Sequence, residues 1–425
     1  MFIRLQNLAE RGARMIQSTP KSLRLHIGLF GRRNVGKSSL LNAILRQQVS
    51  IVSDVPGTTT DPVEKPMELL PLGPVQFIDT AGVDDDGALG ELRIGKTRQV
   101  FDRTDLAILI TDCPELGSYE RQILGELETR KIPSVVVLNK VDIHASSHAA
   151  NPDGFIRVSA KTGQGLNDLR EALLKNAPAD FMDNSALISD LVPPGELAIL
   201  VVPIDKEAPK GRLIMPQVQA IRDLLDGDAM CMVVKERELK AALDRLKSRP
   251  KLVVTDSQAF LKVAADTPDD VPLTSFSILM SRFKGDLTEQ VRGLRAIETL
   301  TSGDKVLVAE ACGHHPIGED IGRVKIPRWL TQYVGAKLDF VHVQGHDFPE
   351  DLSPYKLVIH CGACMCNRRE MLGRIANCRR QDVPITNYGL AIAYSLGILP
   401  RALSPFPAAL ASLTEAAKTT YAHTR

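Results

Sequence analysis

The segment Gly31-Arg-Arg-Asn-Val-Gly36-Lys37-Ser38 lies between an apolar run, residues 25–30, and a stretch of helical period, residues 38–46. A glycine-rich loop that leaves a strand and opens a helix is typical of a phosphate-binding P-loop, whose backbone N–H groups surround a phosphate. Lys37 is expected to reach the β- and γ-phosphates, and the Ser38 hydroxyl to hold magnesium. This order of strand, loop and helix requires an α/β fold.

The rest of the chain repeats this alternation and predicts further domains. With 425 residues, of which 44% are hydrophobic, the chain exceeds one ordinary core. Apolar runs predict parallel-type strands in a first domain (75–78, 106–110, 134–138, 155–158), a second (197–202, 230–234, 252–254) and a third (305–309, 340–343, 356–359, 384–386). We therefore expect an α/β protein in which a P-loop domain, residues 1–180 with an arm at 1–21, precedes two smaller α/β domains at 190–268 and 272–425.

Motifs after two other strands of the first domain predict the bound base and the magnesium shell. Asn139-Lys140-Val141-Asp142 follows the strand at 134–138, and the Asp142 carboxylate suits the N1–H and exocyclic amine of guanine, whereas adenine offers the wrong donors. Ser159-Ala160-Lys161 completes this pocket. Asp79-Thr80-Ala81-Gly82 supplies a carboxylate for the magnesium shell and an amide that senses the γ-phosphate.

Five such motifs in the right order and at strand ends favour a GTPase, although each alone occurs often by chance. Thr59, in Pro56-Gly57-Thr58-Thr59, is the expected switch threonine, and it would bind magnesium together with Ser38. Lys37, Thr59 and Gly82 are the expected catalytic residues. The expected nucleotide-binding residues are Gly31, Asn34, Gly36, Lys37, Ser38, Ser39, Thr59, Asp79, Gly82, Asn139, Lys140, Asp142, Ser159 and Ala160.

This part of the chain resembles GTPases of the Era and TrmE type. Val83 occupies the position after Gly82 where Ras-like proteins carry a water-orienting glutamine, which predicts slow hydrolysis without further assistance. Asn34 matches the asparagine that resembles a potassium ligand in TrmE-type GTPases. The resemblance therefore implies that potassium accelerates hydrolysis.

A second constellation, in the third domain, has the residue types of a metal site. Cys312-x-His314 follows one predicted strand, and His360-Cys361-x-x-Cys364 follows another. Because ligands collect at the carboxyl ends of strands in open α/β sheets, these segments are expected to meet. Three thiolates and a weaker fourth ligand, such as His314, His346 or His360, suit either zinc or an iron–sulfur cluster, and ligand chemistry leaves both open.

The order of these elements resembles the HydF family of FeFe-hydrogenase maturation GTPases over the whole chain. The resemblance implies a 4Fe-4S cluster on Cys312, Cys361 and Cys364, with His314 or His360 as candidate fourth ligand or precursor site. It also implies a GTP-hydrolysing scaffold that delivers the di-iron precursor of the hydrogenase active site. The implied partners are the radical-SAM maturases HydE and HydG and the apo-hydrogenase HydA, and the implied assembly is a homodimer through the middle domain.

Composition narrows the remaining functions. Lys plus Arg number 52 against 51 for Asp plus Glu, so nothing in the bulk charge favours nucleic acid. No apolar run is long enough for a membrane span and no secretory signal is recognisable, so we expect a cytoplasmic protein without membrane partners. The alternative is a ribosome- or tRNA-associated GTPase with a structural zinc domain.

Overall fold

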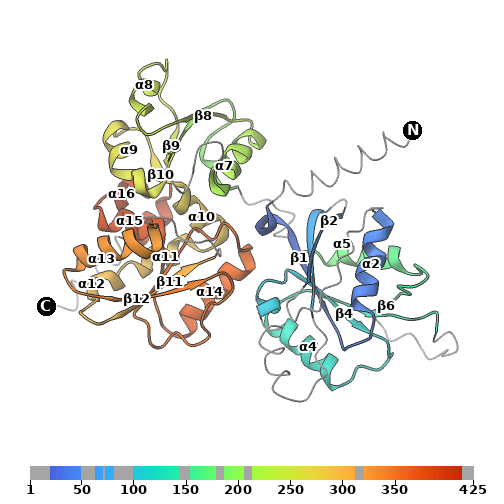
Figure 1. The fold of residues 1–425 in the computed structure, drawn as a ribbon. Coiled ribbons are helices and arrows are strands. Elements are labelled where there is room, and N and C mark those ends of the chain that lie inside the picture. Colours follow the sequence, from blue (N-terminus) through green and yellow to red (C-terminus); the bar gives the residue numbers. More distant parts are fainter. Residues whose placement is uncertain are drawn as a thin grey trace. The chain divides into compact units, whose positions relative to one another are not determined.

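The computed structural model describes residues 20–48, 63–69, 72–80, 99–143, 154–178, 186–204, 213–311 and 320–413. The chain divides into two compact units, Met1–Asn184 and Ser185–Arg425, shown in Figure 1. The first unit corresponds to the expected P-loop domain. The second contains both of the smaller sheets.

The first unit is built on a six-stranded sheet of order β2-β3-β1-β4-β5-β6. Its strands are β1 (Leu25–Phe30), β2 (Val63–Leu69), β3 (Gly73–Asp79), β4 (Leu106–Thr111), β5 (Ser134–Leu138) and β6 (Phe155–Arg157). All neighbours pair in parallel except β2 and β3, which are antiparallel. The five strands predicted from apolar runs are confirmed, and β2 was not predicted, because its sequence VEKPMEL is polar and lies at the sheet edge.

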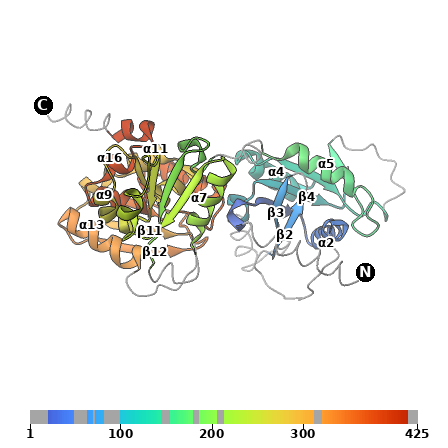
Figure 2. The same ribbon diagram turned by 90° about the horizontal axis from the view of Figure 1, so that it is seen from above.

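Helices cover both faces of this sheet. Leu40 and Leu41 of α2 (Lys37–Gln48) share a core with Leu169 of α5 (Leu166–Asn176). On the other face, Ile123 and Leu127 of α4 (Ser118–Thr129) pack in a separate cluster. Figures 1 and 2 show α2 and α4 on opposite sides of the strands. The carboxyl ends of β1, β3 and β5 therefore meet at one edge, where the motifs lie.

The second unit contains two four-stranded parallel sheets, of order β10-β9-β7-β8 and β12-β11-β13-β14. The strands are β7 (Leu197–Val201), β8 (Met230–Val234), β9 (Leu252–Thr255), β10 (Leu273–Ser275), β11 (Lys305–Glu310), β12 (Asp339–Gln344), β13 (Leu357–His360) and β14 (Ile385–Asn387). The helices are α7 (Met215–Asp226), α8 (Leu239–Leu243), α9 (Phe260–Asp266), α10 (Phe276–Lys284), α11 (Leu287–Gly293), α12 (Ala296–Thr299), α13 (Ile326–Val334), α14 (Arg368–Arg380), α15 (Tyr388–Ser395) and α16 (Leu399–Ala402).

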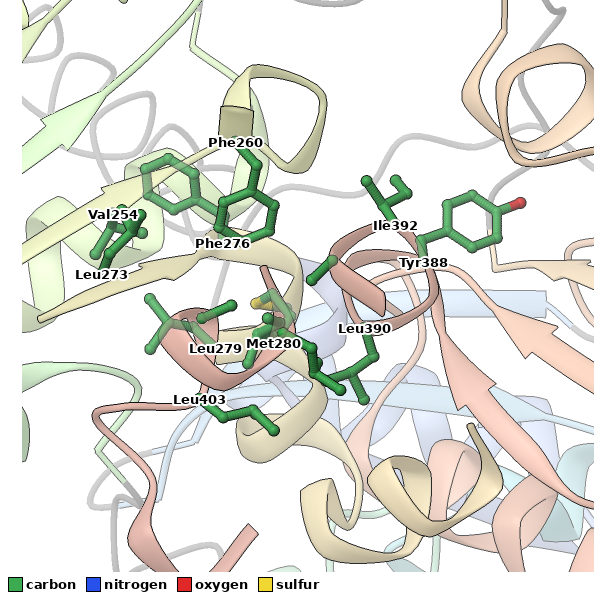
Figure 3. Close-up of a cluster of buried hydrophobic side chains, with 14 of the residues drawn as sticks. Val254, Phe260, Leu273, Phe276, Leu279, Met280, Tyr388, Leu390, Ile392 and Leu403 are labelled. Carbon is green, nitrogen blue, oxygen red and sulfur yellow. The ribbon is translucent and has the colours of Figure 1, made fainter. Parts of the chain in front are cut away.

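One hydrophobic core joins the two sheets of this unit. Phe260, Phe276 and Met280 lie in the same buried cluster as Leu390 and Ile392 of α15, as Figure 3 shows. The expected domain start at residue 272 differs from the structure, because β10 begins at Leu273 and completes the sheet of the middle domain. The polar stretch 266–272 that suggested a boundary is a connection between α9 and β10.

No helix in the described part of the chain combines the length and the apolar character that crossing a membrane requires.

Candidate functional site

The P-loop joins β1 to α2 and holds its lysine tightly. The Lys37 side chain is buried, and Nζ donates hydrogen bonds of 2.8 Å to both the Gly31 and the Arg32 carbonyl oxygens. The ammonium therefore ties the end of the loop at α2 to its beginning after β1.

Two glycines of the loop are required by space as well as by backbone conformation. Gly31 has φ +148°, and a Cβ there would lie 2.3 Å from the Ile110 carbonyl oxygen. Gly36 has φ +95°, and a Cβ there would lie 2.4 Å from Asn139 Nδ2. Asn34, the predicted potassium ligand, also has a positive φ, +63°. A larger residue in place of either glycine would therefore strain the backbone of the loop and collide with its neighbours.

Two of the residues predicted for the magnesium site, Ser38 and Asp79, meet beside the loop. Ser38 Oγ donates a 2.6 Å hydrogen bond to Asp79 Oδ2 at the end of β3. Burial raises the pKa of Asp79, with the Ser38 hydrogen bond and the Lys37 charge acting in the opposite direction. The second oxygen, Oδ1, is buried and has no hydrogen-bond partner among the described residues. A buried carboxylate oxygen of this kind next to a serine hydroxyl fits a magnesium ion and its waters.

The guanine motif is fixed by its own side chains. Asn139 is buried; Nδ2 donates to Val35 O at 2.9 Å, and Oδ1 accepts from the Ala160 amide at 3.1 Å. Asp142 Oδ1 accepts from Ser159 Oγ at 2.6 Å, so the carboxylate predicted to read the base has a set orientation. The structure therefore brings together the P-loop, the NKxD segment and the Ser159-Ala160 segment.

Lys140 and the P-loop have partners that the motifs did not reveal. Lys140 Nζ forms a 2.7 Å ion pair with Asp112, just past β4. Arg32 Nε donates to Glu120 Oε1 at 2.9 Å, and the Gly117 amide donates to Glu120 Oε2 at 3.0 Å. The Gly-x-x-Glu spacing at the start of α4 is a capping signal that could have identified Glu120. The switch residues Thr59 and Gly82, with Val83, lie outside the described residues.

In the second unit, Cys361 and Cys364 form a turn directly after β13. The Cys361 amide donates to Ala309 O at 2.9 Å, and Cys361 Sγ accepts a hydrogen bond from the Ala311 amide at 3.1 Å. Ala363 in the turn has φ +54°. The Cys-x-x-Cys turn is thus seated on the end of β11, immediately before the segment that carries Cys312.

Burial disfavours the thiolate form of both cysteines of this turn. Burial raises the pKa of Cys361, and burial followed by the neighbouring Cys361 raises that of Cys364 to about 12. A metal cation would reverse this preference by binding the thiolates. Cys366 is buried, and its thiol donates to Ala363 O at 3.7 Å.

His360 is held by hydrogen bonds on both ring nitrogens. Arg374 Nη1 donates to Nε2 at 2.8 Å, which leaves Nδ1 as the donor to Cys361 O at 2.9 Å. Burial, with the Arg374 charge, lowers the pKa of His360 to about 3. In this arrangement neither ring nitrogen is available to a metal ion. His346 is likewise engaged, through Nδ1, with Glu370 Oε1 at 2.9 Å.

Polar side chains from neighbouring strand ends support the turn. Asn387, at the end of β14, donates from Nδ2 to Cys361 O at 3.4 Å and accepts from Ser277 Oγ at 2.9 Å. Glu310, at the end of β11, is buried and accepts from Gln344 Nε2 at 3.0 Å. The carboxyl ends of β11, β13 and β14 therefore lie next to one another at the turn.

Cys312 and His314 lie outside the described residues. Among the residues that the structure describes, no three metal-ligating side chains surround a common point. The complete ligand set therefore stays a prediction.

Comparison with known families identifies the second unit. The model of the hydrogen maturase F dimerization domain matches residues 187–285, and that of the hydrogen maturase F tetramerization domain matches residues 288–405. Together they cover more than half of the chain. The chain belongs to the hydrogen maturase F family. The predicted resemblance to HydF is thereby confirmed, and the chain is placed among GTP-binding proteins of hydrogenase maturation.

The first unit is a GTPase domain. Residues 26–140 match the model of a 50S ribosome-binding GTPase. The chain is 39% identical over 155 residues to the tRNA modification GTPase MnmE of Chromobacterium violaceum, covering 36% of this chain and 34% of that protein. It is 34% identical over 191 residues to GTPase Der of Wolinella succinogenes, covering 40% and 39%. The chain thus spans little more than a third of the length of these relatives.

A crystal structure of Era from Aquifex aeolicus aligns with 57% of this chain and with 99% of the Era chain. The sequence identity is 18% and the TM-score is 0.29.

Proposed function

We propose that this protein hydrolyses GTP in its first unit and holds a 4Fe-4S cluster on Cys312, Cys361 and Cys364 in its second. In this function it carries the di-iron precursor of the FeFe-hydrogenase active site to apo-hydrogenase. The family assignment supports the maturation role, and the geometry around Cys361 supports the cluster.

The contact between Ala311 and Cys361 carries the proposal most directly. Ala311 N lies 3.1 Å from Cys361 Sγ, and Cys312 is the next residue in the chain. The Cys-x-x-Cys turn therefore contacts the residue directly after β11, and the Cys-x-His segment begins at the next residue of the sequence. A set of three soft thiolates suits a cluster. When bound, the cluster would supply an iron with an exchangeable ligand. His314 stays a candidate for that ligand, whereas the hydrogen bonds on both ring nitrogens of His360 argue against His360.

In the first unit, the chain's own residues divide the work of GTP hydrolysis. Lys37 balances the phosphate charge, Ser38 and Thr59 hold magnesium with support from Asp79, and the Gly82 amide senses the γ-phosphate. Asn34 is proposed to hold a potassium ion that compensates for Val83. GTPase rates that are equal in sodium and potassium buffers would remove the potassium proposal.

The middle sheet is proposed to form the homodimer. Strand β8 is the edge of its sheet, and Met230 and Val233 on it are 55% and 44% exposed. Val218 and Leu225 of the adjacent helix α7 are 46% and 57% exposed. An apolar edge strand beside an apolar helix face is a liability in a monomer and suits pairing with a second copy.

The proposed partners are HydE and HydG, which build the precursor, and HydA, which receives it, all in the cytoplasm and without nucleic acid. The test is anaerobic activation of apo-HydA, measured as hydrogen evolution. Protein isolated after co-expression with HydE and HydG should activate it, and protein expressed without them should not. Equal activation by both preparations, or none by either, would contradict the carrier function.

The alternative function, a ribosome- or tRNA-associated GTPase with structural zinc, shares the first unit but not the second. The hydrogen maturase F match over residues 187–405 and the near-neutral charge both count against it. Salt-sensitive co-purification with ribosomal RNA, together with stoichiometric zinc, would restore it.

A further inference from the structure

Lys284, the last residue of α10, is a buried lysine in the second unit. Its exposed fraction is 2%, which is unusual because burial of an ammonium is costly unless negative charge lies close by. None of the predicted motifs includes it. Its position relative to the cysteine turn suggests why it is there.

The face of α10 that carries Lys284 packs against the Cys-x-x-Cys turn. A Cβ placed on Gly362, inside the turn, would lie 3.8 Å from both Met280 Cβ and Ser277 Oγ of α10. Lys284 follows Met280 by four residues and Ser277 by seven, so all three share one face of the helix. The lysine therefore lies one helical turn beyond the residues that contact the cysteine turn.

Lys284 carries an ammonium on the face of α10 that packs against the cysteine turn. The other buried cation of this region, Arg374 of α14, forms a 2.6 Å ion pair with Glu370. The cations of this region therefore come from two different helices.

A 4Fe-4S cluster held by three thiolates is anionic, and its reduction adds a further negative charge. The reduction potentials of such clusters respond to local net charge and solvent exposure. We propose that Lys284 is an electrostatic positioning residue that stabilises the reduced cluster and thereby raises its reduction potential. The inference rests on the cluster proposed above and adds a residue that is not a ligand.

The test is a potentiometric titration of anaerobically reconstituted protein, followed by electron paramagnetic resonance. Lys284→Met should keep the iron content but disfavour reduction at least tenfold, a fall in midpoint potential of about 59 mV for one electron. Lys284→Arg, which keeps the charge, should stay near the wild-type potential. Lys305→Met is the matched control, because Lys305 is exposed and lies at the opposite, amino end of β11. The midpoint potential of the cluster in this variant should equal that of the wild type.

Lys284→Gln gives the same readout should the methionine variant fail to fold. A wild-type potential in a loaded Lys284→Met or Lys284→Gln protein would overturn the inference and leave the cluster proposal intact. An equal fall in Lys284→Arg would also overturn it, because packing rather than charge would then set the potential. Wild-type protein without any reducible cluster would instead overturn the proposed function, and this inference with it.

Discussion

At the scale of single residues, the base-reading carboxylate is the most specific determinant in the first unit. Asp142 is oriented by the Ser159 hydroxyl at 2.6 Å. Hydrogen bonds to a charged group contribute about 1.5–3 kcal/mol each, so Asp142→Asn should weaken GTP binding by about 100-fold and improve binding of xanthosine triphosphate. Titration with fluorescent nucleotides measures both.

Asp112→Asn is the matched control for this prediction. Asp112 contacts the Lys140 ammonium and belongs to no base-reading motif, so its variant should keep the preference for guanine. Unchanged GTP affinity in Asp142→Asn would contradict the assignment of the guanine site.

A second residue-scale prediction concerns Glu370, whose buried carboxylate bonds His346 and Arg374. Burial alone would raise its pKa, but the His346 hydrogen bond and the Arg374 charge lower it to about 2. A carboxylate with a lowered pKa stabilises the fold above its unfolded pKa, near 4.5, and this contribution is lost as the pH falls from there towards 2.

The free energy of unfolding of Glu370→Gln at pH 7 should therefore be lower than that of the wild type by about 3 kcal/mol, as an order of magnitude. Between pH 5 and pH 3 the stability of the variant should fall less steeply than that of the wild type. Thermal unfolding of the metal-free protein across this range measures it. Parallel stability curves for the two proteins would show that folding leaves the pKa of Glu370 unchanged, which would contradict this prediction.

Sequence motifs indicated the candidate residues of the nucleotide site, but they did not indicate most of the residues that hydrogen-bond to the two sites and fix their side chains. Asn139 and Asp142 follow from the NKxD spacing, because the base dictates that chemistry. Arg374 follows from no motif, and the Gly-x-x-Glu spacing indicates Glu120 only as a helix cap. The contacts of these residues with His360 and Arg32 join segments that no local pattern relates. The same reason explains why a His-Cys pair suggested His360 as a ligand, while the structure occupies both of its ring nitrogens from elsewhere.

At the scale of elements, most strands were predictable and the boundary in the second unit was not. Buried parallel strands such as β1, β4 and β7 are continuous apolar runs, which the sequence shows directly. Strand β10 has only three residues, Leu273–Ser275, and its pairing with β9 is a tertiary contact. Helix α10 follows it without a break and packs in the core shared by both sheets, so neither sheet is separable from the other (Figure 3).

Strand β8 carries the element-scale prediction. Val233→Lys places a charge on the exposed edge and should halve the mass of the assembly, because a lysine on an edge strand opposes pairing. Analytical ultracentrifugation measures the mass. Leu261→Lys on α9, where Leu261 is 53% exposed, is the control and should leave the assembly unchanged. An unchanged mass in Val233→Lys would place the dimer contact elsewhere.

At the scale of the whole molecule, the nucleotide site and the cysteine turn belong to different compact units. A substitution that disables the site in one unit should therefore leave the activity of the other unit unchanged. Lys37→Ala removes the charge that faces the phosphates and should lower GTP turnover by at least about 100-fold, while iron uptake stays at the wild-type level. Phosphate release and iron analysis on the same sample measure both, and failure to take up iron would refute the separation.

The proposed function depends most on a reducible cluster that the cysteines of the turn help to hold. The direct measurement is electron paramagnetic resonance of dithionite-reduced, anaerobically reconstituted protein, compared among wild type, Cys361→Ser and Cys378→Ser. Cys378 is buried on α14 and is not a predicted ligand, so its variant controls for the loss of a buried thiol. The wild type and Cys378→Ser should give the signal of a reduced 4Fe-4S cluster, and Cys361→Ser should give none while hydrolysing GTP at the wild-type rate. Stoichiometric zinc without a cluster signal in the wild type, or an undiminished signal in Cys361→Ser, would contradict the account.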